Sequence, residues 1–130
     1  MLSDRQKIFT KNIGLLIGKA YDLGFELTFG EVYRTLEQQK IYFDSGRSKT
    51  MDSRHLQRLA VDFNIFKIIN GDPFLLFGIN SMYSTDLEIA RPLGEYWMSL
   101  HPDNVWGGDW NRNGILDETF KDPYHFEIKP

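Results

Sequence analysis

The sequence is organised around SRHLQRLAVD, residues 53–62, which place His55 seven residues before Asp62. Two metal ligands on one helix face are usually three or four residues apart, so this spacing does not indicate a helical pair. The polar half of the stretch runs into an apolar segment, which favours a loop histidine followed by a strand aspartate. Because alternate residues of a strand share a face, Asp62 points away from Val61 and Phe63.

Asp62 needs an explanation, because burying an ionised carboxylate without a partner is costly. One explanation is a metal ion that the aspartate helps to bind. The other is an ordinary edge strand that follows a surface loop and points its aspartate at water. The spacing alone leaves both readings open.

A second polar pattern closes the chain, whose last ten residues read KDPYHFEIKP. Their alternation predicts a short strand with His125 and Glu127 on one face. If this strand lies near Asp62, then His55, Asp62 and His125 can converge, and two imidazoles with one carboxylate are a typical ligand set for catalytic zinc. Asp122 would then face the open coordination position as a general base and acid, with Glu127 as a rival for that role.

Length and composition limit what the chain can be. Its 130 residues suit one domain, residues 1–130, with an ordinary globular content of 42% hydrophobic and 25% charged residues. There is no cysteine for a disulfide or a thiolate metal site, and a net charge of −3 gives no reason to expect nucleic acid as a partner. No apolar run could span a membrane and the N-terminus lacks a hydrophobic signal core. We expect a monomer that is made in the cytoplasm.

Amphipathic spacing predicts two main helices, at residues 3–23 and 84–100, the first with a capping box of Ser3 and Gln6. The other expected elements are a strand at 25–33, a short helix at 35–44 and an aromatic run at 74–77 that packs in the core. We therefore predict an α+β fold, in which a small antiparallel sheet carries the zinc site and packs against the two main helices.

A further constellation lies at residues 109–118, DWNRNGILDE. Asp, Asn and Asn at alternate positions with glycine at the sixth match the start of an EF-hand calcium loop. The twelfth position is Phe120, which offers no carboxylate, so the loop would have to close on an earlier acid. The alternative is a polar loop of Asx turns. The candidate calcium ligands are Asp109, Asn111, Asn113, Asp117 and Glu118.

These motifs resemble those of the zinc peptidases that cut peptidoglycan stem peptides. That family includes D-Ala-D-Ala carboxypeptidases, vancomycin-resistance D,D-dipeptidases and the L-alanyl-D-glutamate endopeptidases of phage endolysins, and it shares its fold with the Hedgehog signalling domain. The resemblance rests on Ser-x-His-x6-Asp ending at Asp62 and on Asp-x-x-His ending at His125. The Tyr-Arg-Thr segment within residues 32–39 and WGGDW at residues 106–110 are also similar to segments of the family, the latter to its endolysin-like branch.

The resemblance implies roles for particular residues. The zinc ligands that it implies are His55, Asp62 and His125. Asp122 would be the general base, and Arg34 would bind substrate and stabilise the developing oxyanion. Further candidate substrate contacts are Gln38 or Gln39, and Ser53. The chain departs from the family at Arg58, where a glycine is usual, and at Asp122, where glutamate is frequent.

The expected function is that of a zinc metallopeptidase that hydrolyses peptidoglycan stem peptides at the L-alanyl-D-glutamate bond. The resemblance implies a phage-type endolysin in host cell lysis, made in the host cytoplasm and acting after release to the cell envelope, with calcium as a regulator. The alternative is a D-Ala-D-Ala carboxypeptidase or dipeptidase of cell-wall metabolism. A rival from another class is a non-catalytic binding module that uses the metal to hold its fold.

Overall fold

The computed structural model describes residues 1–78, 83–116 and 121–130 of the chain. In chain order its elements are α1 (Leu2–Asp22), β1 (Phe25–Phe29), α2 (Leu36–Asp44), the short 3-10 helix η1 (Arg54–Gln57), β2 (Ala60–Ile69), β3 (Asp72–Leu75), α3 (Tyr83–Leu100), β4 (Asn104–Trp106) and β5 (His125–Ile128). The predicted α+β class, with two long helices and a small antiparallel sheet, is confirmed. Among the described residues, no helix has the length and apolar character needed to cross a membrane.

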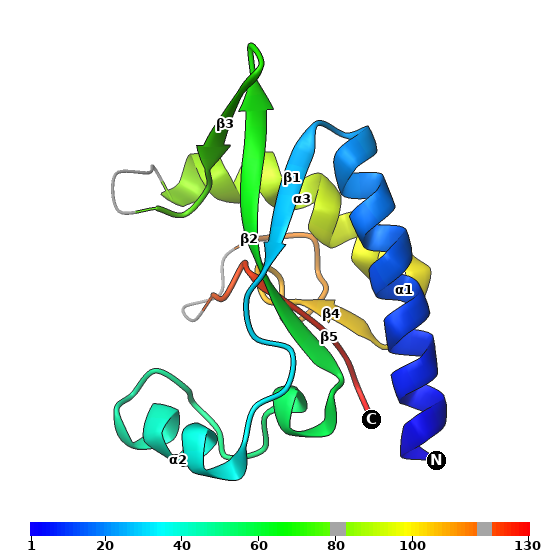
Figure 1. The fold of residues 1–130 in the computed structure, drawn as a ribbon, viewed down its shortest axis with the longest axis vertical. Coiled ribbons are helices and arrows are strands. Elements are labelled where there is room, and N and C mark those ends of the chain that lie inside the picture. The colour runs from blue at the N-terminus through cyan, green and yellow to red at the C-terminus, as the bar shows by residue number, and fades with distance from the viewer. Residues whose placement is uncertain (79–82, 117–120) are drawn as a thin grey trace.

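The sheet is built around β2, which Figure 1 shows running through the middle of the molecule. The strand order is β1-β2-β5-β4, β3 also pairs with β2, and every pair is antiparallel. The register between β2 and β5 sets Asp62 directly opposite His125. Residues far apart in the sequence are thereby brought to one place in the fold.

The core lies between the sheet and the two long helices. Helix α1 packs against α3 and β1, and α3 packs against β4. The ring of Phe9 in α1 meets Trp97 of α3 edge-on, with 5.6 Å between centroids. The face of β2 that was expected to be apolar is buried, at Val61, Phe63 and Ile65. Helix α2 stands apart from α1 and α3 (Figure 1), at the end of the molecule where η1 lies.

The expected start of the first helix is wrong. Helix α1 begins at Leu2, and Met1 is its N-cap residue without a side-chain hydrogen bond. Ser3 therefore lies within the first turn. The side chain of Gln6 donates from Nε2 to the carbonyl of Gln57 at 2.8 Å. A tertiary contact with the end of η1 thus replaces the local capping box.

The strand expected at residues 25–33 ends earlier, at Phe29. Beyond it the chain turns towards β2: the Gly30 N–H donates to the Asp62 carbonyl at 2.7 Å, and the Asp62 N–H donates to the Glu31 carbonyl at 2.8 Å. A Cβ at position 30 would come within 3.2 Å of the Asp62 Cβ, so glycine permits this close approach. The shortened strand places the residues that follow it beside Asp62.

The aromatic run at residues 74–77 is only partly in the core. Leu76 and Phe77 are buried, whereas Phe74 and Leu75 of β3 are 52% and 46% exposed. Both exposed residues lie in β3, which among the described strands pairs with β2 alone and so forms an edge of the sheet.

Candidate metal centre and active site

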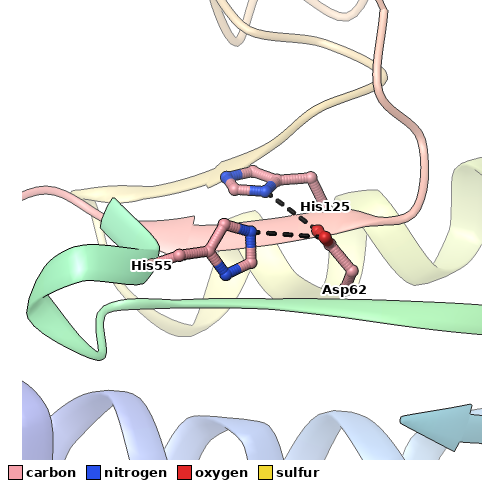
Figure 2. Close-up of side chains that lie close together, drawn as sticks. All are labelled: His55, Asp62 and His125. Atoms are coloured by element: carbon pink, nitrogen blue, oxygen red, sulfur yellow. Dashed lines mark hydrogen bonds and ion pairs between the residues drawn. The ribbon is translucent and has the colours of Figure 1, made fainter. Parts of the chain in front are cut away.

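Three side chains from separate elements point towards one another in Figure 2: His55 of η1, Asp62 of β2 and His125 of β5. The Oδ2 atom of Asp62 lies 3.3 Å from Nε2 of His55, and Oδ1 lies 3.1 Å from Nδ1 of His125. One potential ligand atom from each residue lies within 4.8 Å of the others. Within the described residues no other group of three or more histidines and acids is so arranged. The structure thus brings together the three residues that the sequence predicted to converge.

The second nitrogen of each imidazole is held by another group. Nδ1 of His55 lies 3.1 Å from the Val32 carbonyl oxygen, so this nitrogen donates a hydrogen bond and Nε2 keeps its lone pair. That Nε2 is buried and has no hydrogen-bond partner among the described residues. Nε2 of His125 lies 2.8 Å from Oε1 of Glu127, which leaves Nδ1 to face Asp62. Outer partners of this kind orient metal-binding histidines, so the donor set fits zinc.

The charges in this group are tightly coupled when no metal is bound. Burial alone would raise the pKa of Asp62, but the hydrogen bond with His125 and the nearby imidazole of His55 outweigh burial and hold the pKa far below its usual value. Burial alone would lower the pKa of His125, but its bonds with Asp62 and Glu127 raise it to about 9. The metal-free protein therefore holds a protonated imidazole between carboxylates, and a bound metal cation would take the place of that proton.

Asp122 lies in the turn that leads into β5, and it lines the same cavity as the three candidate ligands. Burial raises the pKa of its carboxyl, and the charge of His125 offsets this only in part. The turn is fixed by its main chain, because the Asp122 N–H donates to the Gly107 carbonyl at 2.8 Å. The indole N–H of Trp106 also donates to the Pro123 carbonyl at 2.9 Å. The position of this carboxyl is thus set by the backbone.

Arg34 is held by four neighbours at the edge of the site, Glu31, Gln39, Tyr42 and Ser53. Its Nε donates to Glu31 Oε2 and its Nη1 to Gln39 Oε1, both at 2.7 Å. Its guanidinium carbon lies 4.7 Å from the centre of the Tyr42 ring, whose hydroxyl donates to Glu31 at 2.8 Å. Nη2 of Arg34 is 3.9 Å from Asp62 Oδ2. The guanidinium is therefore fixed beside the candidate metal ligands.

Neither of the two candidate glutamines lines the cavity among the described residues. Gln39 is fully buried, and besides accepting from Arg34 it donates from Nε2 to Ser48 Oγ and to the Thr50 carbonyl. Its amide holds Arg34 and the loop at residues 46–50, and it is too deeply buried to touch a substrate. Gln38 is not among the described residues that line the cavity.

Two further residues, Ser53 and Arg58, lie at the two ends of the short helix η1 that carries His55. Ser53 is buried and caps η1, since its Oγ accepts from the His55 N–H at 3.3 Å and from Arg34 Nη1 at 3.4 Å. Arg58 ends η1 with φ of 56°, the left-handed conformation that glycine adopts more easily. Its guanidinium lies 4.1 Å from the centre of the Tyr33 ring, a contact that favours arginine there. The family's usual glycine thus reflects a backbone requirement that this chain still meets.

A cavity of about 590 Å³ opens over the site. It is lined by His55, Asp62, His125 and Asp122, with Arg34 and Trp110 among the other lining residues. The Trp110 ring packs on His125, with 5.2 Å between ring centroids. Three further cations line the wall: Arg47 and Lys49 of the loop at residues 46–50, and Arg54 of η1.

The candidate calcium loop forms Asx turns in the part that is described. Oδ1 of Asn111 accepts from the Asn113 N–H at 3.2 Å, and Oδ1 of Asn113 accepts from the Ile115 N–H at 2.8 Å. Asp109 is buried, and its Oδ2 accepts from the Gly114 N–H at 2.9 Å. Asp117 and Glu118 lie outside the described residues. These contacts lend the calcium expectation no support.

The sequence analysis missed three contributors to the site. Val32 acts through its carbonyl, which has no signature in a sequence. Glu31 and Tyr42 act as supports for Arg34. None of the three offered a sequence signal, because Glu31 and Arg34 lie outside any helix, where a spacing of three residues does not predict an ion pair.

The model of the D-alanyl-D-alanine carboxypeptidase family matches residues 46–128. This is more than half of the chain and contains all three candidate metal ligands. The protein thus belongs to the D-alanyl-D-alanine carboxypeptidase family, a class of peptidases that acts on peptidoglycan, and its cluster of His55, Asp62 and His125 offers a donor set that fits zinc.

Two solved structures share the fold. The L-Ala D-Glu endopeptidase ChiX of Serratia marcescens is similar over 93% of this chain and 77% of its own, with a TM-score of 0.60 and 23% identity. A mutant of the vancomycin-resistance D,D-pentapeptidase VanY from a VanB-type cassette, in complex with Zn(II), is similar over 92% of this chain and 70% of its own, with a TM-score of 0.53 and 20% identity. A comparison with curated protein sequences found no significant match.

Proposed function

We propose that this protein hydrolyses the L-alanyl-D-glutamate bond of peptidoglycan stem peptides. The observation that carries the proposal is the single cavity in which Asp122 and Arg34 stand around His55, Asp62 and His125. A non-catalytic, metal-stabilised module would need the three ligands only. Hydrolysis also requires a proton acceptor and a group that stabilises negative charge. Asp122, whose pKa is raised by burial, and the fixed guanidinium of Arg34 meet these two requirements.

The residues of the chain have distinct tasks in this reaction. His55, Asp62 and His125 would hold zinc, which when bound activates water and polarises the scissile carbonyl. Asp122 accepts a proton from the attacking water on its carboxylate and returns it to the leaving amine. Arg34 stabilises the negative charge that develops on the carbonyl oxygen, and its fixed contacts mean that little reorganisation is needed.

The second candidate bond is D-alanyl-D-alanine, which the name of the matching family favours. The endopeptidase activity is favoured by the motif WGGDW at residues 106–110, which resembles the endolysin-like branch, and ChiX bears that activity in its name. The two activities leave different products. Mass spectrometry of muropeptides after digestion with the zinc-loaded protein should show stem peptides that begin with D-glutamate. Loss of the terminal D-alanine alone would instead assign the carboxypeptidase activity.

The biological setting that we propose is host cell lysis by a phage-type endolysin with antimicrobial action. The enzyme would be made in the host cytoplasm and would reach peptidoglycan after release to the envelope. Expression within a bacterial host should then lyse the cells only when a membrane-permeabilising protein is supplied with it. Lysis of cells that produce the enzyme alone would contradict this setting.

Calcium remains a proposal for the loop at residues 109–118. Oδ1 of Asp109 is buried without a hydrogen-bond partner among the described residues, and it is the one feature there that a cation would satisfy. Calorimetric titration of the zinc-loaded protein with calcium tests this directly. The proposal predicts a heat of binding that Asp109→Asn removes while zinc stays bound, and no heat at millimolar calcium would contradict it.

A further inference from the structure

Three cations in the cavity wall have no task in the mechanism above, Arg47, Lys49 and Arg54, and Lys49 has a contact of its own. Arg34 pairs with Glu31, and Arg54 pairs with Asp52. Arg47 also lines the cavity, but within the described residues it forms no ion pair. A guanidinium at a cavity wall without a carboxylate partner is available to bind an anionic group of a ligand.

The backbone around Arg47 is held in place on both sides. The Gly46 N–H donates to the Phe43 carbonyl at 3.2 Å, and the Ser48 N–H donates to the Tyr42 carbonyl at 3.0 Å. Ser48 forms a second hydrogen bond, in which its Oγ accepts from Nε2 of the fully buried Gln39 at 2.8 Å. The loop that carries Arg47 is thus tied to the residue that positions Arg34.

Arg47 and Arg34 share one aromatic ring. Their guanidinium carbons lie 4.6 Å and 4.7 Å from the centre of the Tyr42 ring, and Arg34 in turn reaches Asp62 at 3.9 Å. The Tyr42 hydroxyl is fixed by its hydrogen bond to Glu31. Arg47 is therefore separated by the Tyr42 ring from Arg34, the cation proposed to stabilise the oxyanion.

We propose that Arg47 binds the free α-carboxylate of the D-residue on the leaving side of the scissile amide, an inference that rests on the proposed function. In the L-alanyl-D-glutamate bond the glutamate continues the stem through its γ-carboxyl, so its α-carboxylate is free beside the amide. In D-alanyl-D-alanine the terminal carboxylate occupies the same place. Both candidate substrates thus offer an anion next to the reacting carbonyl, and arginine can bind a carboxylate through two parallel hydrogen bonds.

The test compares peptides that differ only in this carboxylate. One pair carries D-glutamate or its α-amide after L-alanine, and the other ends in D-alanyl-D-alanine as free acid or amide. The wild type should prefer the acid by roughly 10- to 100-fold in kcat/KM, the range expected for a charge-assisted hydrogen bond. Arg47→Gln should remove most of this preference through KM and leave cleavage of the amide unchanged, and Arg47→Lys should restore part of it.

Lys40→Ala is the matched control, because the substitution also removes one positive charge. Lys40 lies in α2 outside the cavity and is paired with Asp44. It should keep the preference for the acid. Equal rates on acid and amide for the wild type, or an equal loss on both with Arg47→Gln, would overturn the role of Arg47 and leave the peptidase intact.

Binding of the same peptides, measured by calorimetry, separates this inference from the proposed function. If the wild type cleaves neither pair, the proposed function fails. Tighter binding of the acid that Arg47→Gln abolishes would still support the carboxylate site, and equal binding of acid and amide would overturn it.

Discussion

Gly107 packs so closely on Asp122 that position 107 has no room for a side chain. A Cβ atom there would overlap the Asp122 carbonyl oxygen and lie 3.1 Å from the Cβ of His125. The Gly107 N–H donates to the His125 carbonyl, and its own carbonyl accepts from the Asp122 N–H, both at 2.8 Å. One glycine thus positions the turn that carries the proposed base and a proposed zinc ligand.

Gly107→Ala should therefore damage both zinc binding and catalysis. Overpacking of this kind costs on the order of 1–3 kcal/mol of stability, and here relief would require the turn with Asp122 and His125 to move. Zinc affinity, measured by competition with a chelator, should fall together with peptidoglycan hydrolysis. Gly18→Ala in α1 is the control, since no atom lies within 4 Å of its added Cβ. Unchanged zinc affinity in Gly107→Ala would mean that the turn does not depend on this contact.

Asp122→Asn should separate chemistry from metal binding. The amide keeps the size of the side chain but cannot accept the proton, and general acid–base groups typically contribute on the order of 10²–10⁴-fold to rate. We expect that loss in kcat with zinc content and melting temperature close to those of the wild type. A variant with near wild-type turnover would assign the base to another group.

Glu127→Gln tests whether Glu127 orients His125 or is itself the base. Its Oε1 accepts from Nε2 of His125 at 2.8 Å, and its Oε2 lies 3.9 Å from Nε of Arg54. Partners behind metal ligands typically contribute about 10- to 100-fold to metal affinity, so zinc binding should weaken by that factor. Glu26→Gln, on the exposed face of β1, should leave it unchanged. Full zinc affinity with lost turnover would instead favour Glu127 as the base.

The metal-free protein should lose stability as the pH rises from about 6.5 to about 9. The pKa of His125 is raised from 6.5 to about 9 by Asp62 and Glu127, so its stabilisation is fully present below 6.5 and is lost as the pH rises through 9. Zinc should remove this slope, because zinc binding requires the neutral imidazole. The stability of the metal-free and zinc-bound proteins is followed by melting temperature at each pH, with and without chelator. His125→Gln should remove the pH dependence of the metal-free protein. A flat metal-free curve in the wild type would contradict the ion pairs.

The convergence of the three candidate metal ligands could be predicted because their residue types and spacing together resemble the ligand pattern of a known family, whereas the spacing alone left two readings open. The antiparallel pairing of β2 with β5 brings Asp62 opposite His125. His55 lies outside both strands, in η1, and its ring is oriented by the Val32 carbonyl. The apolar faces of the two long helices could also be predicted, because buried residues recur with the period of the helix.

The supports of the site could not be predicted, because they depend on tertiary contacts. The role of the Val32 carbonyl follows from where β1 ends, and the role of Gln39 follows from its burial in α2 beneath the loop that carries Arg47. Ser3 illustrates the same limit in the fold. The predicted capping box of Ser3 and Gln6 does not form, because the Gln6 side chain donates a hydrogen bond to the Gln57 carbonyl instead. Such choices are made by long-range contacts that local patterns do not encode.

The most direct test of the central claim is zinc titration of metal-free protein against peptidoglycan hydrolysis. If His55, Asp62 and His125 form a catalytic zinc site, chelator-treated protein should be inactive, and activity should rise linearly and level off at one zinc per chain. Replacing His125 with alanine should abolish both tight zinc binding and activity. Full hydrolysis by protein shown to be free of metal, or stoichiometric zinc retained in the His125→Ala variant, would contradict the account.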